Sequence, residues 1–309
     1  MRIFSDPVAQ EFQTVMSLTD DPLPDLIRTL RNPSADARAR AARALGRLGW
    51  LAREALPLLV NALSDTDPAV RENAAQAVGQ MGPEALPHIT GMLSHEDKYV
   101  RRNAVWALGK LGPLARGVWS ELCTTLRDPD PRTASGAAQA LGNMGADAVE
   151  AIPALTEAMR GTNIVLCRLA SKALSQIGRP ALSSLIAHLR HRDPFVRGEA
   201  ALALGWMGPA ATAAVPSLID ALRPPRTTAA LRAGPVSVAT RTPTTSILNT
   251  PPPASPSTDD NSRACAAQAL GRIGQAASGA IEALTLAAHD PNEQVRQSAL
   301  QAIRQIQTT

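Results

Sequence analysis

Apolar residues recur along the chain at helical spacing, in a unit of 30 or 33 residues that appears eight times. In the copy that spans residues 67–82, Val70, Ala74, Val78 and Met81 form a single apolar stripe on one side of a helix. An aspartate and a proline open this helix and a glycine closes it, which are typical signals for the two ends of a helix. Each unit therefore contains one helix that buries one face.

Another helix precedes it in every unit and follows the pattern Leu-Pro-x-Leu-x-x-x-Leu. In five copies proline stands second, where its fixed backbone suits the first helical turn and its missing N–H costs nothing. The pattern predicts helices over residues 23–30, 56–63, 86–93, 119–126, 152–159, 182–189, 215–222 and 281–288.

Composition favours the same all-helical class. The chain is 45% hydrophobic but contains only three Phe, one Tyr and four Trp, so its core is aliphatic and rich in alanine. Alanine is the strongest helix former, whereas sheets favour β-branched and aromatic residues. Two-helix units of this kind stack into an α-solenoid, because each one buries its apolar face only against its neighbours.

The pattern also divides the chain into segments. Residues 1–22 are not a repeat, and we expect them to form an N-terminal helix that caps the solenoid of residues 23–306. Residues 224–258 are dense in Pro, Thr and Ser and contain no acid. Such a segment cannot bury enough apolar surface to order itself, so we expect a disordered insertion between the two helices of repeat seven.

The spacing Asp-Pro-x-Val-Arg-x-x-Ala-Ala-x-Ala-Leu-Gly resembles the short HEAT repeats of phycobilisome (bilin) lyase subunits and many other bacterial proteins. The resemblance covers residues 23–306 apart from the insertion. It implies an all-α, right-handed α-solenoid, an armadillo-type superhelix of about eight two-helix HEAT repeats. Lyases, phycobilisome-degradation factors, hydroxylases and plain adaptors share this repeat, so the resemblance implies a fold and leaves the activity open.

The face most open to a partner is formed by positions three, six and ten after the recurring Val, which lie on one side of the second helix. In solenoids of this kind the second helices usually line the concave surface. Asn and Gln dominate this stripe, and its N-terminal end is basic. The candidate binding residues are Arg43, Arg47, Asn73, Gln76, Gln80, Asn103, Trp106, Lys110, Gln139, Asn143, Lys172, Gln176, Trp206, Gln268 and Arg272.

Two tryptophans, Trp106 and Trp206, lie on this polar stripe. Tryptophan offers a large apolar area with one N–H donor and is frequent at binding hot spots. Each ring could equally fill a groove against a neighbouring helix. Both interpretations stay open at the level of the sequence.

An arginine follows the Val position in six repeats. Asp67, Asp97 and Asp193 each stand four residues before one of these arginines. Because side chains at this spacing are neighbours on a helix, we expect ion pairs within each repeat rather than an arginine ladder that binds a partner. The arginines are Arg38, Arg71, Arg101, Arg197, Arg263 and Arg296.

Catalytic and metal chemistry find no support in the residue pattern. The three cysteines are widely spaced, and His188 and His191 are better explained as solvated helix ends than as zinc ligands. His95-Glu96 occurs once, in a loop, whereas the HEAT-like hydroxylases hold iron with repeated His-Glu pairs. We therefore predict no catalytic residue, metal or cofactor.

These observations predict a monomeric cytoplasmic scaffold that binds another protein or peptide on its concave surface, without a membrane. If the chain is an enzyme, the resemblance implies a bilin lyase or lyase subunit that acts on phycobiliproteins, although no lyase motif can be carried over. Weak nucleic-acid binding is a second alternative. The net charge of +4 and pI near 9.4 are mild for 309 residues, so we do not expect it.

Overall fold

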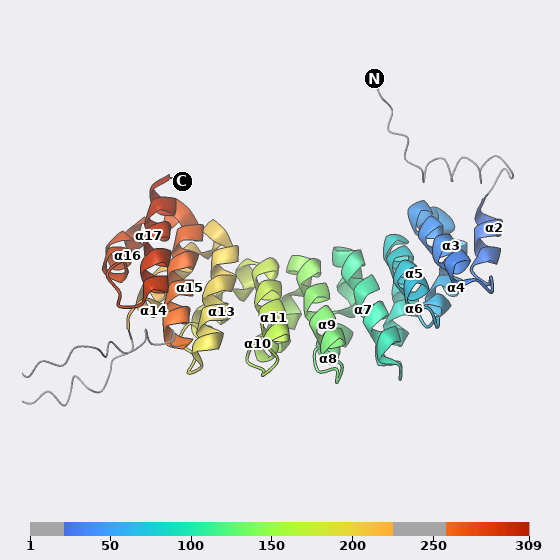
Figure 1. Cartoon of the computed structure of the whole chain (residues 1–309), viewed down its shortest axis with the longest axis horizontal. Helices are drawn as coiled ribbons and strands as arrows, with labels where there is room; N and C mark the ends of the chain where they lie inside the picture. The colour runs from blue at the N-terminus through green and yellow to red at the C-terminus, as the bar shows by residue number, and fades with distance from the viewer. Residues whose placement is uncertain (1–21, 225–257, 309) are drawn as a thin grey trace, which may run out of the picture. The chain divides into compact units, whose positions relative to one another are not determined.

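A computed structural model describes residues 22–224 and 258–308, and in these ranges every regular element is a helix (Figure 1). The chain divides after Ile177 into two compact units, called here the first and the second unit. The all-α solenoid fold is confirmed. The predicted capping segment 1–22 and insertion 224–258 lie, apart from their end residues, outside the described residues.

Helices follow one another in pairs. In the first unit the pairs are α2 (Leu23–Thr29) with α3 (Ala35–Leu48), α4 (Leu56–Ala62) with α5 (Pro68–Gln80), α6 (Leu86–Thr90) with α7 (Lys98–Leu111), α8 (Trp119–Thr125) with α9 (Pro131–Met144), and α10 (Ile152–Met159) with α11 (Ile164–Ile177). In the second unit they are α12 (Leu182–His188) with α13 (Pro194–Trp206), α14 (Val215–Ala221) with α15 (Thr258–Ile273), and α16 (Ile281–Ala287) with α17 (Glu293–Thr308). Every first helix begins at the residue that the sequence pattern predicts.

The 30- and 33-residue periods come from the connection between pairs. A short 3₁₀ segment joins each pair to the next, and it has seven residues in Gly49–Ala55 but three in Pro83–Ala85 and Arg179–Ala181. The glycine at the end of the second helix has positive φ, as in Gly82 with φ 96°. This left-handed conformation favours glycine and turns the chain towards the next pair.

Second helices of successive repeats pack side by side within each unit, as α5, α7 and α9 do in Figure 1. A second glycine lies inside the second helix, three residues before the closing glycine, and at most of these positions it faces the neighbouring second helix at close distance. A Cβ added to Gly142 of α9 would lie 3.0 Å from Ala173 Cα on α11. The backbones therefore approach each other closely at a Gly–Ala contact.

Four of the recurring arginines, Arg38, Arg101, Arg197 and Arg263, pair with an aspartate of the following repeat, and the predicted pairs with Asp67, Asp97 and Asp193 are not formed. Arg38 donates through Nε and Nη2 to both carboxylate oxygens of Asp65, 27 residues further along the chain, at 2.8 Å each. Arg101 pairs in the same way with Asp128, and Arg197 pairs with Asp259. The bidentate pairs of Arg38 and Arg101 hold the loop of one repeat against the helix of the preceding one.

The aspartates that were expected to pair with the arginines cap their own helices instead. Asp67 Oδ1 accepts hydrogen bonds from the N–H groups of Ala69 and Val70, so its carboxylate is already satisfied. The guanidinium of Arg71 donates to the carbonyl oxygens of Asp65 and Thr66 in the loop. The N–H groups at the start of α5 therefore bind the Asp67 carboxylate, and Arg71 does not pair with it.

Hydrogen bonding from Arg38 holds the pKa of Asp65 below its ordinary value.

Repeats three and four depart from this pairing. Where the following repeat has no aspartate at the equivalent position, the arginine contacts a different side chain. His95 replaces the aspartate in repeat three, and the Arg71 guanidinium lies 5.1 Å from the centre of the Tyr99 ring. Repeat four has Ala134 in place of the arginine.

Candidate binding site

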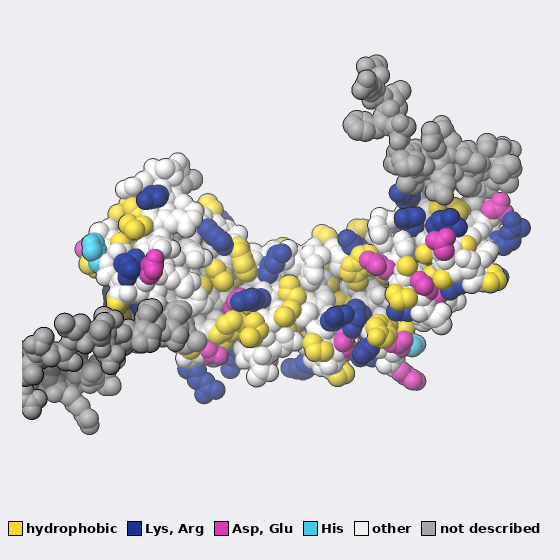
Figure 2. All heavy atoms as spheres, in the orientation of Figure 1, with side chains coloured by type: hydrophobic (Ala, Val, Ile, Leu, Met, Phe, Trp, Pro, Cys, Tyr) yellow, Lys and Arg dark blue, Asp and Glu magenta, His cyan; other side chains and the backbone are white. Residues whose placement is uncertain are grey.

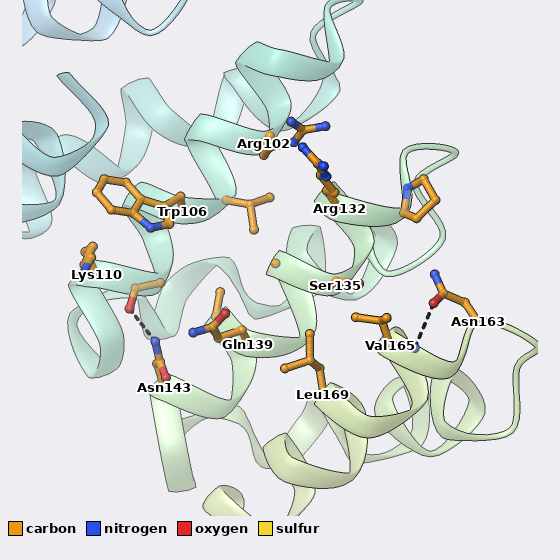
Figure 3. A pocket seen from close by; sticks show the side chains of 15 residues that line it. Arg102, Trp106, Lys110, Arg132, Ser135, Gln139, Asn143, Asn163, Val165 and Leu169 are labelled. Carbon is orange, nitrogen blue, oxygen red and sulfur yellow. Dashed lines mark hydrogen bonds between the residues drawn. The ribbon is translucent and has the colours of Figure 1, made fainter. Parts of the chain in front are cut away.

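An open hollow of about 540 Å³ lies across α7, α9 and α11 in the first unit (Figure 3). Four of the residues predicted from the sequence line it, namely Trp106, Lys110, Gln139 and Asn143. They stand at positions six and ten of repeats three and four. The structure therefore brings part of the predicted stripe together around one concave site.

One wall of the hollow is aromatic and the opposite wall is aliphatic. Trp106 of α7 is 36% exposed, and Val165 of α11, which lies across the hollow in Figure 3, is 60% exposed. Leu169 lies one turn further along α11 and is half-buried. Apolar side chains left open to solvent on facing walls are suited to hold an apolar side chain of a partner.

Basic side chains surround this apolar part. The Lys110 ammonium lies 5.0 Å from the centre of the Trp106 ring, a cation–π contact that holds the lysine beside the indole. Arg102 and Arg132 lie together at another edge of the hollow (Figure 3). No Asp or Glu stands among the residues that line the hollow.

Arg102 is held in place by Asp130, which accepts from Arg102 Nη2 at 3.1 Å with both of its carboxylate oxygens. Burial by itself would raise the pKa of Asp130, but hydrogen bonds from Thr133 and Arg102 outweigh it and lower that pKa. The charge of Arg102 is therefore largely neutralised. Arg132 has no ion-pair partner among the described residues, so its charge is available to a ligand.

Two polar side chains of the hollow have no hydrogen-bond partner among the described residues. Ser135 is 8% exposed and presents a free hydroxyl, and the Gln139 amide on the same helix is free and exposed. By contrast, Asn143 Nδ2 donates to Gly109 O at 2.9 Å, and Asn163 Oδ1 caps α11. The hollow therefore offers one amide and one hydroxyl that a bound molecule can satisfy.

The other predicted residues lie elsewhere. Outside the hollow in the first unit, the exposed ones are Arg43, Arg47, Gln76, Gln80, Lys172 and Gln176. Trp206, Gln268 and Arg272 belong to the second unit, where Trp206 is 44% exposed. These residues remain predicted binding residues, but they do not line the hollow.

Position three of the stripe is less open than we expected. Asn103 is half-buried, and its Nδ2 donates to the Leu63 carbonyl of the preceding repeat, at 3.2 Å. Asn73 is also half-buried and donates to Ala69 O of its own helix. The equivalent residues of the second unit, Glu199, Cys265 and Ser298, are buried. The neighbouring repeat covers this position because second helices pack so closely.

Most of the residues that line the hollow were not among the predicted candidates. Arg102, Arg132, Ser135 and Val165 line it from positions outside the predicted stripe. One signal was present in the sequence, since the exposed apolar pair Ile164-Val165 opens α11, whereas the other second helices of the first unit begin with Ala, Pro or Lys. The depth of a hollow depends on the distance and angle between neighbouring helices, and the sequence pattern of a single repeat does not determine these.

Charge is unevenly distributed over the chain. The second helices of the first unit, α3, α5, α7, α9 and α11, carry twelve arginines and lysines but only two acids, Asp36 and Glu72. Basic and apolar side chains are interspersed on the face shown in Figure 2. A net charge that is mild for the whole chain is thus gathered on one set of helices.

The described residues contain no group of three or more His, Cys, Asp or Glu side chains that could hold a metal ion. In the same part of the chain, no helix is long and apolar enough to cross a bilayer. Cys123 is half-buried, and desolvation raises the pKa of its thiol, which is the opposite of what a nucleophilic cysteine needs.

No curated protein matches this sequence. Among solved structures, E. coli YibA is 15% identical with a TM-score of 0.49 over 100% of both chains. Human deoxyhypusine hydroxylase in complex with glycerol is 22% identical with a TM-score of 0.37 and covers 98% of this chain and 100% of its own. The CpcE–CpcF complex of phycocyanin lyase from Nostoc sp. PCC7120 is 18% identical with a TM-score of 0.42, over 91% of this chain and 93% of its own.

All three TM-scores lie below 0.5, so we base no conclusion about fold or activity on these structures. The sequence comparison with protein families is more direct, because the model for HEAT repeats matches residues 23–94, 86–166 and 152–233. The matched segments overlap and together cover more than half of the chain. With the paired helices and the recurring caps described above, they show that this chain belongs to the HEAT-repeat family.

Proposed function

We propose that the chain is a protein-interaction scaffold that holds a partner in the hollow between α7, α9 and α11. The observation that carries the proposal is the meeting of an exposed tryptophan, an aliphatic wall and unpaired polar groups at one concave site. Large aromatic side chains surrounded by such groups dominate the binding energy of many protein interfaces. The bilin lyase alternative rests on likeness of fold alone and gains nothing from this site.

Only one of the two tryptophans lines the hollow, which provides a matched control. Trp106→Ala removes the aromatic wall, and we expect it to weaken retention of a partner at least about tenfold, the lower range for a hot-spot residue. Trp206→Ala removes a ring of comparable exposure that does not line the hollow, so we expect it to leave retention of a partner held in the hollow unchanged. Both variants should have the circular dichroism of the wild type.

The measurement is quantitative mass spectrometry of proteins that the full chain and each variant retain from a lysate of the source organism. A protein retained by the wild type and by Trp206→Ala, but lost with Trp106→Ala, supports the proposal. If every retained protein is held equally by the Trp106→Ala variant, the hollow is not the binding site.

A further inference from the structure

We infer that the ligand of this hollow is an acidic peptide segment that carries an aliphatic side chain between its carboxylates. The inference rests on the proposed function, because it names the chemistry of the partner at the same site. Its basis is the combination of charge and shape around Trp106, Lys110, Arg132 and Val165.

Charge complementarity is the first step. Lys110 and Arg132 line the hollow from α7 and α9, and neither has a carboxylate partner among the described residues. Arg102 adds little to this attraction, because Asp130 largely neutralises its charge, although its side chain is 26% exposed. A cationic site without acids attracts anions and repels basic segments.

The apolar walls decide what kind of anion fits. An aliphatic side chain can insert between Trp106 and the Val165 and Leu169 side chains, where it buries surface that is now exposed to water. Nucleic acid would place phosphates and sugars in this position and would need many more cations along its path. A peptide with carboxylates on both sides of a leucine satisfies the cations and the apolar walls together.

The unpaired polar groups fit the backbone of such a peptide. The Gln139 amide can donate to a peptide carbonyl and accept from a peptide N–H, and the Ser135 hydroxyl can do the same. Both belong to α9, which runs through the middle of the hollow (Figure 3). An extended peptide laid across α9 would therefore meet hydrogen-bonding groups between two sets of cations.

The test is fluorescence anisotropy on the full chain with a short labelled peptide that repeats Asp-Glu-Leu. Counter-probes are a peptide that repeats Asp-Glu-Ser, which has the same charge without leucine, and a single-stranded oligothymidine of equal charge. We expect the Asp-Glu-Leu peptide to bind at least about tenfold more tightly than either, and its affinity to fall with added salt.

Variants locate the site. The double change Lys110→Glu and Arg132→Glu should weaken the Asp-Glu-Leu peptide by about a hundredfold, since each reversal removes an attraction and adds a repulsion. Arg116→Glu reverses an exposed charge outside the hollow, and the affinity should stay within about twofold. Trp106→Ala should reduce binding of the leucine peptide to the level of the serine peptide.

Each other outcome overturns the inference. Tighter binding of oligothymidine would indicate a nucleic-acid surface, and equal loss in Arg116→Glu would indicate unspecific charge attraction. Absence of peptide binding would exclude this ligand class. If a partner from the lysate were still lost with Trp106→Ala in that case, the proposed function would stand and only its chemistry would be wrong.

Discussion

Replacing Arg263 by methionine should lower the free energy of unfolding by about 3–5 kcal/mol, the usual cost of removing one partner from a buried ion pair. Arg263 is 4% exposed and pairs with Asp290 and Asp260. Burial by itself would lower its pKa, but these two carboxylates raise it, so the arginine stays charged. Methionine would leave the Asp290 carboxylate, itself 7% exposed, without its cation.

Urea unfolding of the full chain, followed by circular dichroism, measures this effect. Arg304→Met on α17 is the control, because Arg304 is exposed and has no ion-pair partner among the described residues. We expect it to change the free energy of unfolding by less than about 0.5 kcal/mol. A cost below about 1 kcal/mol for Arg263→Met would mean that the pairs between repeats do not hold the solenoid together.

The two glycines Gly142 and Gly109 should respond to alanine in opposite directions. At Gly142 the new Cβ would lie 3.0 Å from Ala173 Cα, a backbone atom that cannot yield without moving α11. We expect Gly142→Ala to destabilise the chain by about 1–3 kcal/mol, the usual cost of overpacking. At Gly109 the nearest atom is Ala140 Cα at 3.7 Å, which is ordinary contact.

Gly109→Ala should therefore stabilise the chain by up to about 1 kcal/mol, because alanine is the better helix former and nothing obstructs its Cβ. Thermal unfolding of both variants measures the difference, and each one serves as the control of the other. If both variants destabilise the chain equally, the helical glycines are needed for backbone conformation and not for close packing.

The sequence predicted the elements well because each helix carries its own signals. The first helices begin at Leu56, Trp119 and Ile281 as the Leu-Pro pattern indicated, and Gly82 has the left-handed backbone expected of a cap. These features depend on interactions within about one turn of helix, so a single repeat encodes them.

Contacts between repeats were predicted less well. Arg38 pairs with Asp65 of the next repeat, while Asp67 caps its own helix, because the helix N–H groups are closer to that carboxylate. Asn103 was expected to face a partner but bonds to the preceding repeat. Periodicity places a residue on a face of its helix, whereas its partner across the repeat depends on how closely the helices approach.

The candidate site also combines residues that the pattern of one repeat predicts with residues that only the packing of neighbouring repeats brings together. Trp106, Lys110, Gln139 and Asn143 could be predicted from the face they share, and the structure gathers them around one hollow. Val165 was not predicted, because its apolar side chain lines the hollow only through the way the first turn of α11 packs against α7 and α9. The lining of this hollow therefore depends in part on the repeat pattern and in part on how the helices pack.

Site-specific photocrosslinking tests the central claim most directly. A benzoylphenylalanine in place of Gln139 stands in the middle of the hollow, and the same group in place of Thr124 stands exposed on α8 of the same repeat, outside it. We predict that the partner whose retention requires Trp106 crosslinks from position 139 and not from position 124. Crosslinking from position 124 alone would contradict the claim that the hollow holds the partner.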